Sequence, residues 1–85
     1  MSYQVVVARS ADRELQTLPA EIHQRLAASL LRLEANPRPR GARKLAHGSG
    51  WRLRVGDYRV LFTVDDEAHV VTVYAVGHRR DIYRR

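Results

Sequence analysis

The residues best suited to chemistry lie in one stretch of the sequence, Trp51-Arg52-Leu53-Arg54-Val55-Gly56-Asp57-Tyr58-Arg59-Val60-Leu61-Phe62. On both sides of Gly56-Asp57, apolar residues alternate with other residues, which is the period of a half-buried strand. A Gly-Asp pair suits a two-residue turn of type II′, with glycine at its first central position. The register set by this turn predicts that Arg54 lies directly opposite Arg59 and that Arg52 shares their face.

Two arginines opposed across a hairpin destabilise the sheet, which suggests that the pair has a function. Like charges directly opposed in a sheet destabilise it by about 0.2–1 kcal/mol per pair. Guanidinium groups match phosphate oxygens in a bidentate fork, so the pair is well suited to hold a phosphate. The alternative interpretation is that Arg52, Arg54 and Arg59 are solvated charges on an exposed face.

Several kinds of catalytic site have no signal in this sequence. It has no cysteine, no Gly-rich phosphate loop, no nucleophile elbow and no His or carboxylate cluster at metal-ligand spacing. A metal nuclease and a paired-carboxylate hydrolase are therefore disfavoured, and we expect neither a metal nor another cofactor.

A set of arginines with tyrosine and one lysine can still cleave RNA, because RNA supplies its own nucleophile, the 2′-hydroxyl. The enzyme must align this hydroxyl, remove its proton and stabilise a dianionic phosphorane. We expect Tyr83 to act as the base, since nearby cations lower the pKa of a phenol, with Lys44 or His78 assisting proton transfer. The alternative for Tyr83 is a packing role against the core. Further RNA contacts are expected from Arg43, Arg80 and the ring of Tyr74, which could stack on a base.

Composition supports a polyanionic partner. The chain has 85 residues and a net charge of +6, and all but one of its fifteen basic residues are arginine, the exception being Lys44. An Arg-dominated basic domain favours nucleic acid. An Arg-rich proteome is an alternative cause of the Arg:Lys ratio, but it does not explain where the arginines lie. The length predicts a single domain over residues 1–85. The lack of cysteine, signal peptide and membrane span predicts a cytoplasmic protein without membrane contact.

The elements that must position these residues follow from local patterns. Residues 3–8 read as a first strand, and a helix is expected after Ser10 as N-cap. Pro19 opens a second helix, so the two form a hairpin with almost no loop or one helix kinked at Pro19. The apolar stripe of the second helix consists of Ile22, Leu26, Leu30 and Leu33.

The remaining strands follow these helices. A short strand is expected at residues 43–46, then the hairpin strands, and a last strand over 69–77. On the last strand, Val71, Val73 and Ala75 should share the face of Phe62, and Thr72 and Tyr74 the face of Arg59. The result is an α+β domain of order β-α-α-β-β-β, with a mainly antiparallel curved sheet, the helix hairpin on one face and a short C-terminal helix.

Two motifs together resemble a known family. The hairpin sequence quoted above and Val76-Gly77-His78-Arg79-Arg80-Asp81-Ile82-Tyr83-Arg84, with Leu-Pro between the helices, resemble the RelE toxins of the RelE/ParE superfamily over nearly the whole chain. The resemblance implies a RelE-like fold and a type II toxin that enters the ribosomal A site and cuts mRNA by 2′-hydroxyl attack on the adjacent phosphate. It implies a metal-independent endoribonuclease with these catalytic residues: Arg52, Arg54, Arg59, Arg79 and Tyr83.

The resemblance also implies partners: the ribosome and its mRNA, a RelB-like acidic antitoxin, and operator DNA through the toxin-antitoxin complex. Well-known members carry lysine at the positions of Arg52 and Arg54. Because arginine does not release its proton, we expect charge stabilisation from both. Two other functions stay open: a ParE-like inhibitor of DNA gyrase on the same fold, and a non-catalytic module that binds RNA or the ribosome.

Overall fold

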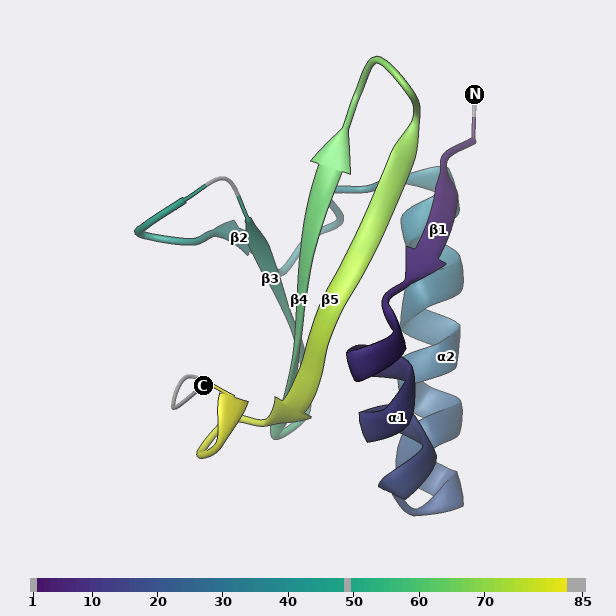
Figure 1. Ribbon diagram of the computed structural model, residues 1–85, viewed down its shortest axis with the longest axis vertical. Helices are drawn as coiled ribbons and strands as arrows, with labels where there is room; N and C mark the ends of the chain where they lie inside the picture. The colour runs from purple at the N-terminus through teal and green to yellow at the C-terminus, as the bar shows by residue number, and fades with distance from the viewer. Residues whose placement is uncertain (1, 49, 83–85) are drawn as a thin grey trace.

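The protein, as a computed structural model, is described over residues 2–48 and 50–82. Two helices lie on one face of a five-stranded sheet whose order is β1-β5-β4-β3-β2 (Figure 1). The five strands are β1 Gln4–Val7, β2 Ala42–Lys44, β3 Trp51–Val55, β4 Tyr58–Asp65 and β5 Val70–His78. β1 pairs with β5 in parallel, and the other neighbours are antiparallel. The expected α+β architecture is confirmed, with a mixed, mainly antiparallel sheet.

The helices form the hairpin that was one of the two expected arrangements. α1 (Arg9–Thr17) and α2 (Ala20–Ala35) are separated by Leu18, which is extended, and by Pro19, whose ψ of 147° is not helical. Proline disfavours helical backbone at the residue before it, which ends α1 there. Pro19 is the N-cap of α2 and not its first residue.

The expected N-cap of the first helix was wrong by two residues. Ala8 is the N-cap, and Ser10 lies inside the first turn. The N–H of Ala8 donates to the carbonyl of Val73 at 2.8 Å, while its own carbonyl accepts from Asp12 at 2.9 Å. The last bond of the parallel ladder thus coincides with the first turn of the helix, which leaves no free residue for a serine cap.

The core lies between the helices and the sheet. Leu26, Leu30 and Leu33 of the expected α2 stripe are buried, and Ile22 is half-buried. The sheet contributes Leu53 and these fully buried residues: Val60, Phe62, Val71, Val73 and Val76. The helices therefore cover the face of β3 and β4 that the alternation assigned to the core, and the opposite face is open.

The hairpin register is the predicted one. Arg54 opposes Arg59, and Trp51 opposes Phe62. Gly56 has a φ of +60°, whereas the φ of Asp57 is not positive. Positive φ at the first central residue alone is the type II′ turn.

One strand expectation fails because of a bulge. Leu61 opposes Ala75, whereas Phe62 opposes Val73, so Tyr74 is an extra residue in β5. The side-chain period shifts at a bulge. Ala75 therefore lies on the open face with Leu61, and Val76 takes its place in the core.

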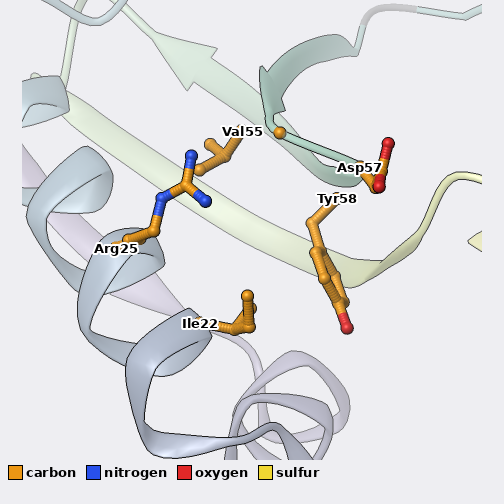
Figure 2. A pocket seen from close by; sticks show the side chains of 6 residues that line it. Ile22, Arg25, Val55, Asp57 and Tyr58 are labelled. Carbon is orange, nitrogen blue, oxygen red and sulfur yellow. The ribbon is translucent and has the colours of Figure 1, made fainter.

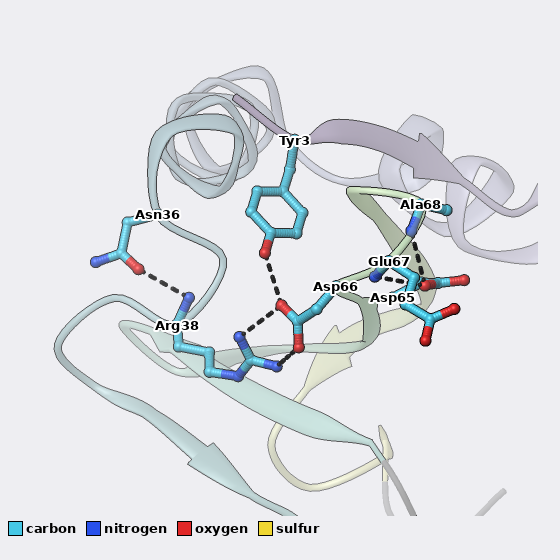
Figure 3. A network of polar contacts seen from close by, with 7 residues as sticks. All are labelled: Tyr3, Asn36, Arg38, Asp65, Asp66, Glu67 and Ala68. Carbon is cyan, nitrogen blue, oxygen red and sulfur yellow. Dashed lines mark hydrogen bonds and ion pairs between the residues drawn. The ribbon is translucent and has the colours of Figure 1, made fainter. Parts of the chain in front are cut away.

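A polar network closes the end of the molecule where β4 ends (Figure 3). The Tyr3 hydroxyl donates to Oδ1 of Asp66 at 2.6 Å, and Arg38 binds both oxygens of the same carboxylate, at 3.1 and 2.8 Å. The Arg38 guanidinium also lies 5.2 Å from the centre of the Trp51 ring. Three separate segments are joined in this way: the chain before β1, the loop after α2 and the β4–β5 turn.

The end of the described chain returns to the hairpin. Arg79 donates its N–H to the carbonyl of Asp57 at 2.8 Å, and the chain turns over residues 79–81 on the side of the sheet away from the helices (Figure 1). Most of the expected C-terminal helix lies outside the described residues. Within residues 2–48 and 50–82, no helix is long and apolar enough to cross a membrane.

Candidate functional site: an arginine-lined depression

Four arginines from three strands converge on the open face. Arg43 of β2 lies opposite Arg52 of β3, and Arg54 of β3 lies opposite Arg59 of β4. They line one depression of about 500 Å³, whose wall consists of Gly41, Arg43, Arg52, Arg54, Gly56 and Arg59. We call this the arginine depression. The sheet thus holds two directly opposed like-charge pairs, of which the sequence predicted one.

Arg59 is the most enclosed of these cations. Its exposure is only 9%, and its Nη1 donates to the carbonyls of Gly56 at 3.3 Å and Tyr58 at 3.2 Å. Among the described residues, no carboxylate pairs with it, and no other atom of its guanidinium takes part in a hydrogen bond. The turn carbonyls therefore fix the orientation of a nearly buried cation and leave donors for an anion.

A second depression of similar volume, about 500 Å³, adjoins the first and shares Arg43 and Arg52 with it. Lys44, His47 and Leu61 are among its lining residues. Lys44 therefore lines the adjoining depression and not the arginine depression itself, and in the register it opposes Trp51, one residue out of phase with Arg43. His47 is also here, although sequence reasoning gave it no role.

Tyr74 reaches across the open face of β4 from β5. Its hydroxyl lies 2.8 Å from the position that a Cβ on Gly50 would occupy. The residue is 37% exposed, so a base could stack on its ring.

The other predicted residues stand apart from the depression. His78 opposes Tyr58 in the register, meets its ring edge-on at 5.5 Å between centroids, and accepts the N–H of Arg80 at Nδ1. Strand alternation thus gives His78 the helix-covered face, which does not support its expected role. Arg79 and Arg80 are exposed in the turn after β5 and line none of these depressions. Tyr83 lies outside the described residues.

Sequence reasoning missed two arginines on α2. The guanidinium of Arg25 lies against the hairpin turn, with Nη2 3.5 Å from the position of a Cβ on Gly56. Figure 2 shows this side chain extending from α2 toward Val55, above Ile22. Arg32 lies two turns further along the helix and lines a groove with Arg25 and Arg54. No local signal in the sequence says which strand end this helix face meets.

The chemistry available here is the stabilisation of anions. Guanidinium groups stay protonated throughout a reaction and present paired donors to phosphate oxygens. Residues 2–48 and 50–82 contain no group of three or more His, Cys, Asp or Glu side chains placed to hold a metal ion. The arginine depression can therefore bind a phosphate and stabilise charge that develops on it.

Comparison with known proteins identifies the class. Residues 5–83 match the family described as ParE toxin of type II toxin-antitoxin system, parDE. Toxin RelG of Mycobacterium tuberculosis is 38% identical over an alignment of 92 positions that covers 100% of each of the two chains. The chain therefore belongs to the RelE/ParE family of type II toxins, and it is a RelE-like member.

Solved structures agree in fold. The toxin-antitoxin complex RelBE2 of Mycobacterium tuberculosis contains a chain with a TM-score of 0.84 and 29% identity, matched over 93% of this chain and 100% of that one. The archaeal RelE-RelB complex of Pyrococcus horikoshii has the same TM-score of 0.84 and identity of 29%, covering 95% of this chain and 99% of its counterpart. Both relatives were solved with RelB-type antitoxins.

Proposed function

We propose that this toxin is a ribosome-dependent endoribonuclease that cuts mRNA in the A site without a metal ion. The 2′-hydroxyl oxygen forms a bond to the adjacent phosphorus while the bond to the 5′-oxygen breaks. The products are a 2′,3′-cyclic phosphate end and a 5′-hydroxyl end. The hydroxyl proton passes to a base and the leaving oxygen receives a proton from an acid.

The observation that carries the proposal is the arginine depression. Four guanidiniums from three strands line it, at the cost of two like-charge pairs, and the part of the chain that the structure describes places no acidic residue in its wall. Arg59, held by two carbonyls, is best placed to bind the phosphorane oxygens, and Arg52 and Arg54 would neutralise its second charge. The proposed acid is Lys44, which lines the adjoining depression. Tyr83 as base and Arg79 as a further phosphate ligand follow from the family resemblance.

The test is the mapping of mRNA ends on translating ribosomes after induced expression. We expect cuts within codons for the wild type, and their loss in Arg59→Ala. Arg13→Ala, which removes an exposed arginine of α1, is the matched control and should cut normally. A message carrying a 2′-deoxy nucleotide at the cut position should resist cleavage. Cutting of that message would contradict 2′-hydroxyl attack.

A second candidate is a ParE-like inhibitor of DNA gyrase, which the matched family description favours. That activity has no need of a phosphorane-stabilising face. It predicts growth arrest with intact mRNA and blocked supercoiling, and insensitivity of the arrest to Arg59→Ala. A purified gyrase supercoiling assay beside the mRNA mapping separates the two activities.

The proposed partners follow from the same class of protein. We expect a small acidic RelB-like antitoxin to cover the basic surface, because burying the self-repelling arginines against carboxylates relieves their repulsion. Operator DNA would be contacted through the toxin-antitoxin complex, mainly by the antitoxin. If the ribosome is the site of action, as we propose, the toxin acts in the cytoplasm.

A further inference from the structure

A second basic groove lies on the other side of the β3–β4 turn. Arg25 and Arg32 are seven residues apart on α2, which brings them to one side of the helix. The small residues Ala28 and Ser29 lie between them. Together with Arg54, Val55 and Gly56 they line a groove of about 400 Å³, which we call the α2 groove.

The α2 groove is continuous with the arginine depression. Arg54 and Gly56 line both. β2 begins at Ala42, opposite Leu53, so the last residues of β3 have no strand partner on that side. The two basic surfaces meet around this unpaired edge of β3, and Arg54 lies between them.

The charge of the α2 groove is not compensated. No acidic residue lines it, and among the described residues no carboxylate pairs with Arg25, Arg32 or Arg54. Arg25 and Arg32 are both exposed. The apolar residues that line the α2 groove, within residues 2–48 and 50–82, are Ala28 and Val55, which give little of the apolar anchoring that centres most protein interfaces. A polyanion suits this surface better than a folded protein does.

We propose that the α2 groove binds the phosphate backbone of the RNA strand whose scissile phosphate occupies the arginine depression. This inference rests on the proposed function and adds a subsite to it. A single-stranded RNA would pass from the open face around the unpaired edge of β3 and onto α2. Positively charged grooves follow single-stranded backbones in this way, and each phosphate contact adds to the salt dependence of binding.

The test uses fluorescein-labelled 2′-O-methyl RNA, which lacks the attacking hydroxyl, in strands of about 4 and about 12 nucleotides. Binding to the full-length toxin is measured by anisotropy over a range of salt concentrations. The test variant is Arg25→Ala/Arg32→Ala. The matched control is Arg9→Ala/Arg13→Ala on α1, which removes the same charge at exposed positions. Circular dichroism melting shows whether each variant is folded.

We expect the test variant to bind the longer strand about tenfold more weakly than the wild type does. Its slope of log K against log salt should be shallower by about 1.4, since each lost phosphate contact of a single strand contributes about 0.7. Binding of the shorter strand, and every measurement on the control, should be unchanged.

Three results would overturn the inference. The first is that the test variant binds the longer strand like the wild type, and the second is that the control loses as much affinity as the test variant. The third is that the test variant loses affinity for a poly-glutamate peptide and not for RNA, which would make an acidic protein the occupant. Failure of the proposed function is recognised separately, because Arg52→Ala/Arg59→Ala would then leave the binding of both strands unchanged.

Discussion

At the scale of single residues, Arg59 shows how a sheet can hold a nearly buried cation without an acid. A buried charge is costly unless hydrogen bonds compensate it. Here the carbonyls of Gly56 and Tyr58 do so through Nη1. Because the carbonyls belong to the turn, the guanidinium is held in place before any phosphate arrives, and preorganised charge is what stabilises a transition state best.

Arg59→Lys tests this geometry while keeping the charge. A lysine ammonium is a compact point charge and lacks the planar fork that can hold both carbonyls and still face a phosphate. Loss of one charge-assisted hydrogen bond costs about 1.5–3 kcal/mol, so we expect cleavage on ribosomes to slow by roughly 10–100-fold. Arg13→Lys should cut at the wild-type rate. Full activity of Arg59→Lys would mean that charge alone matters at this position.

Arg54→Ala separates activity from stability. Removing Arg54 relieves its repulsion with Arg59. We therefore expect the free energy of unfolding to stay the same or to rise by up to about 1 kcal/mol, while cleavage is lost. Urea unfolding beside the ribosome cleavage assay measures both quantities. A clear drop in stability would show that Arg54 packs favourably and that the opposed pair carries no cost.

At the scale of elements, the β3–β4 turn is where the site is assembled. Gly56 contributes the carbonyl that holds Arg59, and it lines both the arginine depression and the α2 groove, which Arg25 also lines. Its φ of +60° is a conformation that side chains with a Cβ adopt only at a cost. One turn residue therefore supports both basic surfaces.

Gly56→Ala should destabilise the protein through its backbone. The nearest atom to the added Cβ is Nη2 of Arg25 at 3.5 Å, an ordinary contact, so strain and not a clash sets the cost. We expect the free energy of unfolding to fall by about 1–2 kcal/mol, which lowers Tm by about 4–8 °C for each kcal/mol in a domain of this size. Asp57→Ala, in the same turn at negative φ, is the control and should leave Tm almost unchanged. An equal fall in both would contradict the assigned turn type.

The sequence predicted this hairpin because its determinants are local. A two-residue turn fixes the register, and strict alternation fixes the faces, so Arg54 and Arg59 were correctly paired. The bulge at Tyr74 has no such signal, since it depends on how β5 fits both β1 and β4. The approach of Arg25 to Gly56 depends on how α2 lies across the sheet, which is a long-range property of packing. The α2 groove was missed for this reason.

At the scale of the whole molecule, the polar network around Asp66 joins segments that are far apart in the chain. Tyr3 and Asp66 are 63 residues apart, and Arg38 and Asp66 are 28 apart. Their meeting at the far end of β4 ties the first strand, the loop after α2 and the β4–β5 turn together (Figure 3). No pattern within any one segment predicted it. The eight residues of β4 separate this network from the turn that builds the site. Stability can therefore be altered at the network without changing the arginine depression.

The pH dependence of stability reports on this network. Hydrogen bonds from Arg38, then from Tyr3, lower the pKa of Asp66 from its ordinary value of 3.8 to about 2. Because the folded state favours the ionised carboxylate, the stabilisation is present above about pH 4 and is lost as the pH falls toward 2. We expect Asp66→Asn to have a lower Tm than the wild type at pH 7, with the difference vanishing near pH 2, and to cleave normally on ribosomes. Glu67→Gln changes the neighbouring acid in the same turn and should show no such pH-dependent gap; a gap as wide as that of Asp66→Asn would mean that general charge, and not this network, stabilises the acidic turn.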